Sequence, residues 1–179
     1  MIDTHTHLYV EAFDEDREKV VQKALHSGIT DFYIPAIDCT YHERMFDLEA
    51  QFPDQIHLMM GLHPTHVKEN YKIELEKVNQ LLEQRNFVAV GEIGIDLYWD
   101  RTFLSEQQEA FNTQIMWAKA RRLPIVIHCR DAFEEVFEVL ESHKGPALKG
   151  IFHCFTGTLE QAYQAIELNF KLGIGGVVT

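Results

Sequence analysis

The sequence predicts an α/β fold in which parallel strands and crossover helices alternate, arranged as a barrel and not as an open sheet. Short apolar runs alternate with stretches of helical periodicity along the 179 residues. Residue types that commonly bind metals stand at the ends of four of these runs. In a closed barrel these strand ends surround one point, whereas in an open sheet ligands so widely spaced would meet less readily.

Seven apolar runs are predicted as strands, and short loops and helices separate them. The run at 124–128 is almost continuously apolar, as expected for a parallel strand that is covered on both faces. The seven predicted strands lie at residues 1–4, 31–35, 55–62, 87–93, 124–128, 150–155 and 170–174.

Helices are predicted between the strands at residues 14–27, 41–51 and 73–84, and three more are expected to begin near residues 105, 131 and 158. Gly28 is the expected stop of the first helix. Ser105 and Thr158 each precede a glutamine by three residues, which is the spacing of a capping box. Asp131 is expected to cap the helix between those two.

The length predicts that the barrel is incomplete. Eight strand–helix units typically need about 250 residues, and about 200 is near the minimum. The sequence has 179 residues and reaches about seven strands, and no helix follows residues 175–179 to cover them. We therefore expect one barrel domain over 1–179, without internal repeats or linkers, that is a C-terminally truncated piece of a longer chain.

The composition is that of a globular protein, with 46% apolar and 25% charged residues. Lys and Arg number 16 against 28 Asp and Glu, and the net charge of −12 argues against broad charge-driven binding to nucleic acid or membranes. A bound divalent cation can still create a local anion site. Without an apolar span or an export signal, we expect a cytoplasmic protein; no obligate protein partner is indicated.

Cysteine usage does not suggest a disulfide framework. The sequence has three cysteines, at positions 39, 129 and 154, and the last two directly follow candidate histidine ligands. Because neighbours on a strand point to opposite faces, we expect Cys129 and Cys154 to be buried structural thiols that face the helices.

Five residues at strand ends are the candidate metal ligands. His5 and His7 are two apart, so both project to one face of an extended strand. Glu92 lies within an apolar strand, where an unpaired carboxylate would be costly, and its two oxygens can bridge two cations. His128 and His153 follow apolar strand residues. The alternatives are surface histidines at 5 and 7, a buried ion pair of Glu92 with an arginine, and core histidines at 128 and 153.

Other residues near the same strand ends are candidates for binding substrate. His63 ends the third strand and is better placed to hydrogen-bond substrate than to bind metal. Arg130 suits a phosphate or carboxylate, or alternatively a salt bridge to Asp131 or Glu134. Asp96 and Tyr98 follow Glu92, and substrate contact and support of the ligands both remain open for them. The other histidines, at positions 26, 42, 57, 66 and 143, look like ordinary loop or helix residues.

Taken together, these motifs resemble the TatD family of metal-dependent hydrolases, in the amidohydrolase superfamily. The resemblance spans the chain and rests on Asp3-Thr4-His5-Thr6-His7, Gly61-Leu62-His63-Pro64, Gly91-Glu92-Ile93-Gly94-Ile95-Asp96, His128-Cys129-Arg130 and His153-Cys154-Phe155-Thr156-Gly157. It implies a TIM-type (β/α)8 barrel and a metal-dependent deoxyribonuclease, often described as a 3′→5′ exonuclease. By similarity, the metal ligands would be His5, His7, Glu92, His128 and His153.

Two further implications follow from the resemblance. Many binuclear superfamily members bridge their metals with a carboxylated lysine at the end of strand four, and this chain has Glu92 there, as TatD proteins do. The family also has an aspartate after strand eight, which binds metal and activates the water, and this sequence ends before that point. The expected activity of the chain itself therefore depends on whether that aspartate is dispensable.

The leading hypothesis is hydrolysis of DNA phosphodiester bonds at single-stranded ends, with one or two divalent cations (Mg, Mn or Zn) that lower the pKa of bound water. Glu92 would bridge the cations, and His63 and Arg130 would orient the phosphate as the other catalytic residues. One alternative is hydrolysis of a small-molecule amide, lactone or ring, which the acidic net charge slightly favours. Another is a non-catalytic metal-binding protein.

Overall fold

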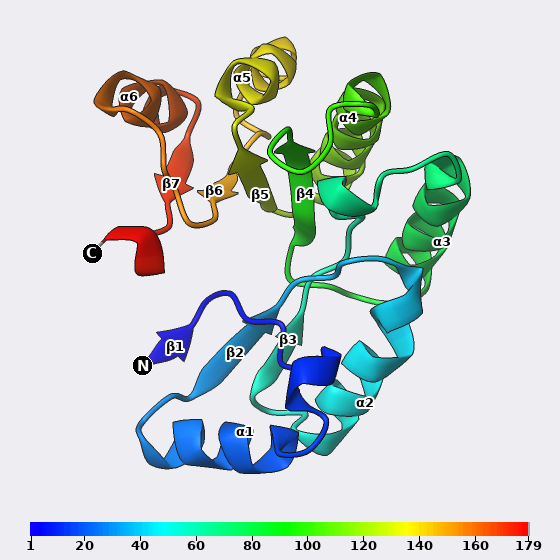
Figure 1. Cartoon of the computed structure of the whole chain (residues 1–179), viewed down its shortest axis with the longest axis vertical. Helices are drawn as coiled ribbons and strands as arrows, with labels where there is room; N and C mark the ends of the chain where they lie inside the picture. Colours follow the sequence, from blue (N-terminus) through cyan, green and yellow to red (C-terminus); the bar gives the residue numbers. More distant parts are fainter. Residues whose placement is uncertain (179) are drawn as a thin grey trace.

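The computed structural model of the protein describes residues 1–178, which form parallel strands with helices along their outer side (Figure 1). The strands belong to two sheets, each ordered as in the sequence. The first sheet contains β1 (Ile2–Asp3), β2 (Asp31–Ile34) and β3 (Ile56–Leu58). The second contains β4 (Val90–Asp96), β5 (Ile125–Arg130), β6 (Gly150–Phe152) and β7 (Phe170–Leu172).

The two sheets join between β3 and β4. Met60 and Val90 form a parallel bridge. The N–H of Met60 donates to the carbonyl oxygen of Ala89 at 3.2 Å, and that of Gly91 donates to Met60 at 3.0 Å. Within residues 1–178 the order therefore runs from β1 to β7, and no hydrogen-bonded ladder between β7 and β1 closes the barrel. The predicted α/β barrel architecture is confirmed, with two open edges on the side where both chain ends lie (Figure 1).

Six α-helices occupy the positions expected from the periodicity, with small shifts at their ends. They are α1 (Arg17–His26), α2 (His42–Gln51), α3 (Tyr71–Gln84), α4 (Leu104–Arg121), α5 (Phe133–Ser142) and α6 (Leu159–Glu167). Short 3-10 helices form at η1 (Glu11–Phe13), η2 (Cys39–Tyr41), η3 (Pro64–His66) and η4 (Gly176–Val178). The sequence predicted that no helix covers residues 175–179. The last of these, Thr179, lies outside the described residues. No helix of residues 1–178 is long and apolar enough to cross a membrane.

The predicted helix ends are partly correct. Gly28 follows α1 with a φ of +92°, and Thr158 and Gln161 form the expected capping box at α6. The capping box at Ser105 is wrong, because α4 begins at Leu104 and its N-cap residue Phe103 offers no side-chain hydrogen bond. The cap at Asp131 is also wrong, because α5 begins two residues later.

The observed bounds of strand β4 differ from the predicted ones. It was expected at 87–93, but it runs over Val90–Asp96, and every residue in it is buried. The predicted strand ended at Ile93, directly before Gly94, and the observed strand continues for three more residues. In the structure Glu92 and Asp96 both lie within the strand, so two buried carboxylates occupy its site-facing part.

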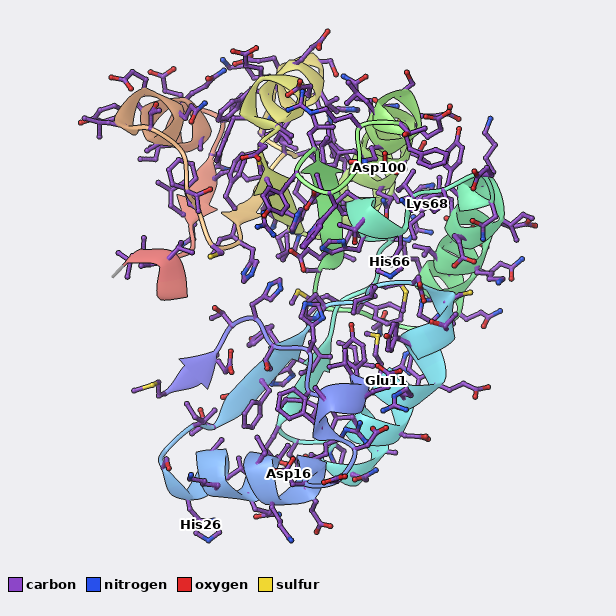
Figure 2. The ribbon with its side chains drawn as sticks, in the orientation of Figure 1. Glu11, Asp16, His26, His66, Lys68 and Asp100 are labelled. Carbon is purple, nitrogen blue, oxygen red and sulfur yellow. The ribbon has the colours of Figure 1, made fainter. Side chains whose placement is uncertain are left out.

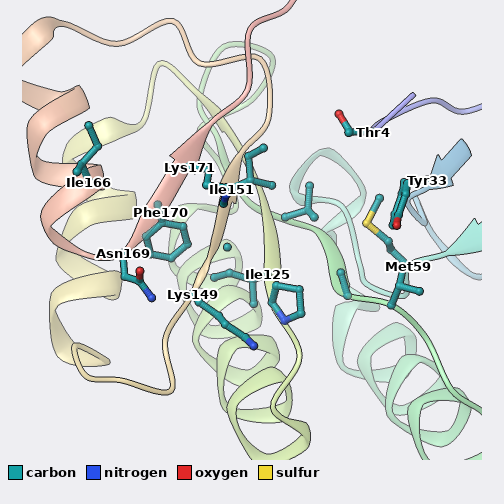
Figure 3. Close-up of a pocket in the computed structure, with 15 residues that line it drawn as sticks. Thr4, Tyr33, Met59, Ile125, Lys149, Ile151, Ile166, Asn169, Phe170 and Lys171 are labelled. Carbon is teal, nitrogen blue, oxygen red and sulfur yellow. The ribbon is translucent and has the colours of Figure 1, made fainter. Parts of the chain in front are cut away.

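The core has an outer and an inner part. Most buried apolar residues fill the space between strands and helices, while Met59, Ala89 and Val126 form a separate cluster with Tyr33 and Ile151. This inner cluster lines a cavity of about 560 Å³ (Figure 3). Its lining is mainly apolar, and Lys149 and Lys171 are the charged residues there. Because no acid, base or nucleophile converges in it, this cavity is not the candidate active site.

Candidate metal centre

Glu92 is the centre of a cluster of histidines. It lies in β4 with 2% of its surface exposed, and ring nitrogens from three other parts of the barrel approach its carboxylate. The distances to the carboxylate oxygens are 3.0 Å from Nε2 of His5, 3.4 Å from Nε2 of His7, 3.8 Å from Nε2 of His63 and 3.1 Å from Nδ1 of His128.

The two oxygens of Glu92 serve different partners. Oε2 faces His5, His7 and His63, and Oε1 faces His128. In two groups, His5–His7–Glu92 and His63–Glu92–His128, the potential donor atoms lie within 4.8 Å of one another. Donor atoms on one cation lie up to about 4 Å apart, so only small adjustments separate both groups from a metal shell. Imidazole and carboxylate donors with a shared carboxylate fit one or two divalent cations.

The hydrogen bonds of His7 leave one of its nitrogens free to bind a cation. The hydroxyl of Tyr9 donates to the carbonyl oxygen of Pro35 at 2.7 Å. It therefore accepts from Nδ1 of His7, 2.9 Å away. In neutral His7 the proton then sits on Nδ1, and Nε2 presents its lone pair toward Glu92.

His63 has the opposite arrangement. The backbone N–H of Thr65 donates to Nδ1 of His63 at 3.2 Å, so Nδ1 is an acceptor and the proton of the neutral ring sits on Nε2. Burial lowers the pKa of His63 to about 3, which keeps the ring neutral at physiological pH. His63 therefore lies among the potential ligands, but it presents an N–H toward the centre of the site. This tautomer suits a hydrogen bond to substrate better than metal binding.

His128 lies between two carboxylates. Its Nε2 is 2.7 Å from Oδ2 of Asp96, and Asp96 is itself 2% exposed. Burial disfavours the charged imidazolium of His128, but the hydrogen bonds to Asp96 and Glu92 outweigh it and raise its pKa to about 9. Burial would also raise the pKa of Glu92, yet the surrounding histidines, with His128 and His5 as hydrogen-bond partners, hold that pKa well below its ordinary value. Asp96 thus orients the candidate ligand His128, whereas the sequence left open whether Asp96 contacts substrate or supports a ligand.

His5 and His153 form the remaining wall of the site. Their rings stack with centroids 3.4 Å apart. Nδ1 of His5 is buried and has no hydrogen-bond partner within residues 1–178. Burial lowers the pKa of His153 to about 4, so its ring is neutral and keeps a lone pair. Among the described residues, His153 belongs to neither of the two donor groups above, although it lines the same cavity.

A cavity of about 620 Å³ opens in front of these side chains. It is a size typical of small-ligand sites. Arg130 and Tyr98 line it together with His7, His63, Glu92, His128 and His153. The guanidinium carbon of Arg130 lies 3.7 Å from the centre of the Tyr98 ring. Within residues 1–178 no ion pair joins Arg130 to Asp131 or Glu134, so its charge remains available at the cavity.

The cysteines only partly match their prediction. All three are free and half-buried. Burial raises the pKa of Cys129 to about 12, and this thiol packs against the core. Cys129 and Cys154 were both expected to face the helices, but both line the site cavity, and the backbone turns at Cys154 with a φ of +45°.

The remaining histidines lie outside the cluster. His26 is on α1, far from the second sheet, and His66 lies beside His63 (Figure 2). His66 pairs with Asp38 at 3.6 Å and His57 pairs with Asp31 at 2.8 Å. His42 is buried in α2.

The chain is similar in sequence and fold to known metal-dependent hydrolases. The sequence model of a family described as "TatD related DNase" matches residues 2–179. The uncharacterized metal-dependent hydrolase YabD of Bacillus subtilis (strain 168) is 35% identical over 179 residues, which are 100% of this chain and 70% of that protein. A Pantoea ananatis (strain LMG 20103) protein named 3′-5′ ssDNA/RNA exonuclease TatD is 30% identical over 178 residues, 99% of this chain and 68% of that protein. The crystal structure of YjjV, a TatD homologue from Escherichia coli K12, superimposes with a TM-score of 0.91 at 32% identity, covering 100% of this chain and 69% of that one.

Proposed function

We propose that this chain, which belongs to the family of TatD related DNases, takes part in metal-dependent hydrolysis of phosphodiester bonds in single-stranded DNA, from the 3′ end. The family and its relatives named metal-dependent hydrolases support the hydrolase class. Relatives named 3′-5′ ssDNA/RNA exonucleases support the substrate. The observation that carries the proposal is the buried carboxylate of Glu92, on which nitrogens of four histidines converge. The proposed location is the cytoplasm.

The residues of the chain would hold one or two divalent cations, Mg, Mn or Zn. The ligands would be His5, His7, Glu92, His128 and His153. A cation held there would supply Lewis-acid chemistry, because it would lower the pKa of water and stabilise negative charge on phosphoryl oxygens. The donor set fits this role, because Nε2 of His7 directs an otherwise unused lone pair toward the carboxylate of Glu92, which Nε2 of His5 also approaches.

Two other side chains would position the scissile phosphate. Arg130 places a permanently charged guanidinium at the cavity, and such a group can donate two parallel hydrogen bonds to phosphate oxygens. His63 presents Nε2–H to the same cavity, beside His128. Since burial keeps His63 neutral, its hydrogen bond would not depend on pH across the physiological range.

The decisive experiment follows the shortening of 5′-radiolabelled single-stranded DNA with Mg, Mn or Zn, and with EDTA. Glu92→Gln keeps the shape but removes the bridging charge, so activity should fall at least about a hundredfold, beyond the loss usual for groups that only support ligands. Glu74→Gln is the matched control, because Glu74 is also a buried glutamate but lies outside the cluster, beside Cys39 and Lys77. Cleavage that survives EDTA or Glu92→Gln would contradict the proposal. Turnover of a small amide or lactone without nuclease activity would instead support the rival substrate class.

A further inference from the structure

We propose that Tyr98 and Trp99, held in place by Arg130 and Asp96, form a stacking platform for one unpaired nucleobase beside the metal cluster. This inference rests on the proposed function and adds a base subsite to it. The site described so far would recognise phosphate alone. The platform would let the chain distinguish a single-stranded nucleic acid from other phosphodiesters.

Both rings are unusually exposed for their size. Tyr98 is 52% exposed and Trp99 70% exposed, and they stand edge to face with centroids 4.8 Å apart. Tyr98 lines the cavity that contains Glu92 and His128, and Trp99 lies next to it on the loop after β4. Large aromatic faces in water next to a catalytic cavity offer area that a base can cover, and such stacking is typical of single-strand binding sites.

Arg130 fixes the tyrosine side of the platform. Its guanidinium carbon lies 3.7 Å from the Tyr98 ring centre and 5.5 Å from that of Trp99. These distances are those of cation–π contacts, which hold the guanidinium in place and leave its positive charge intact. Arg130 would thereby contact both the phosphate and the rings on which the base stacks. In a nucleotide the phosphate and the base are likewise neighbours.

The backbone of the aromatic loop is anchored at both ends. Oδ1 of Asp96 accepts hydrogen bonds from the N–H groups of Tyr98, at 3.1 Å, and Trp99, at 3.2 Å. Past the rings, Asp100 pairs with Lys68 at 3.4 Å, and both are labelled in Figure 2. A loop held in this way loses little entropy when a ligand binds. Oδ2 of the same Asp96 accepts from His128, which couples the platform directly to the metal cluster.

Stacking also accounts for binding by an acidic chain. With a net charge of −12, the protein has little electrostatic attraction for a polyanion beyond Arg130 and the bound cations. Base stacking does not depend on net charge, and it is available only where bases are unpaired. The platform therefore predicts a preference for single strands over duplexes and only a weak dependence of affinity on salt.

The first test uses the fluorescence of Trp99. The sequence has two tryptophans, and Trp117 packs against the core, so Trp117→Phe leaves Trp99 as the reporter. Oligothymidylate, with phosphorothioate linkages to prevent turnover, is added in the presence of Mg and separately in EDTA. A saturable quench is expected with oligothymidylate and not with an abasic strand of equal length and charge. An oligouridylate arm distinguishes DNA from RNA as the source of the base.

The second test separates base binding from catalysis. Trp99→Ala should raise KM for single-stranded DNA about tenfold and leave kcat within about twofold, because one lost base stack is worth roughly that factor in affinity. Trp99→Phe should restore most of the loss. Cleavage of the abasic strand should be unaffected by either change, which controls for damage to the metal cluster.

The outcomes distinguish this inference from the proposed function. Metal-dependent cleavage with equal KM in wild type and Trp99→Ala would overturn the platform and leave the nuclease proposal standing. Quenching of Trp99 by oligothymidylate without any cleavage would support the platform and contradict the nuclease proposal. A Trp99 signal that responds equally to the abasic strand would mean a phosphate contact. A signal that changes only with protein concentration would mean self-association. Either result would overturn the base subsite.

Discussion

For each imidazole of the site, the partner of one ring nitrogen decides what the other can do. Tyr9 fixes the proton of His7 on Nδ1 and exposes the lone pair of Nε2, whereas Thr65 leaves His63 with its proton on Nε2. The two rings lie close to the same oxygen of Glu92, at 3.4 Å and 3.8 Å, yet one is prepared to bind a cation and the other to donate a hydrogen bond. Position along the chain predicts the same division of roles, and the hydrogen-bond partner of each Nδ1 gives the physical reason for it.

The hydrogen bond between Asp96 and His128 can be tested by substitution. Asp96→Asn weakens the acceptor for Nε2–H of His128 and removes a buried charge, so the affinity for Mn or Zn should fall about 10- to 100-fold, as is usual for groups that orient a ligand. Isothermal titration calorimetry measures this directly. Asp54→Asn, at an exposed carboxylate outside the cluster, serves as the control and should bind metal like the wild type. An unchanged metal affinity in Asp96→Asn would show that Asp96 does not orient His128 for metal binding.

Among the elements, β4 positions the site because it packs unusually close to β5. Gly94 has a φ of +140°, and a Cβ built there would lie 2.0 Å from the carbonyl oxygen of His128. A Cβ at Gly91 would lie 2.7 Å from Cβ of Val126. These glycines let the backbone that carries Glu92 approach the strand that carries His128, which brings the carboxylate within hydrogen-bond distance of the imidazole.

Gly94→Ala should therefore lower the free energy of unfolding by at least about 2 kcal/mol, through both backbone strain and the clash with β5. Gly145→Ala is the matched control, since Gly145 also has a positive φ, of +153°, but nothing lies within 4 Å of its added Cβ. Urea denaturation gives both values, and the difference between them measures the clash alone. Equal losses in the two variants would show that the close approach of β4 and β5 is not limiting.

For the whole molecule, the cluster of histidines around Glu92 connects the two sheets. His5 and His7 follow β1 of the first sheet, while Glu92 and His128 belong to β4 and β5 of the second. Within residues 1–178 the sheets also share one hydrophobic core and the hydrogen bonds between β3 and β4, which include the bridge of Met60 with Val90. A bound cation would add a further connection, on the side of the barrel where no ladder joins β1 to β7 within residues 1–178.

Cation binding should consequently stabilise the entire fold. At a free concentration of about 100 times Kd, the free energy of unfolding should rise by about 2.7 kcal/mol, which for a chain of this size corresponds to roughly 5–10 °C in Tm. Thermal melts followed by circular dichroism with Mn or Zn, and then with excess EDTA, provide the measurement. The same cation added to Glu92→Gln should leave Tm nearly unchanged. A rise of equal size in that variant would indicate binding elsewhere.

The sequence by itself determined the alternation of strands and helices, the barrel class and the residues that surround Glu92. Those features follow from local periodicity and from the rule that the ends of parallel strands converge. The prediction failed locally at the ends of elements: Ile93 was taken to end a strand that continues to Asp96, and Ser105 and Asp131 were taken for helix caps.

Only the tertiary structure decided how each site residue is used. The proton of His7 depends on Pro35, the orientation of His128 depends on Asp96, and the stacking of His153 depends on His5, 148 positions away in the sequence. The same holds for Arg130, which could equally have paired with Asp131 but lies over Tyr98. The physical reason is that hydrogen bonds and ring contacts are set by positions in space, which periodicity along the chain does not encode.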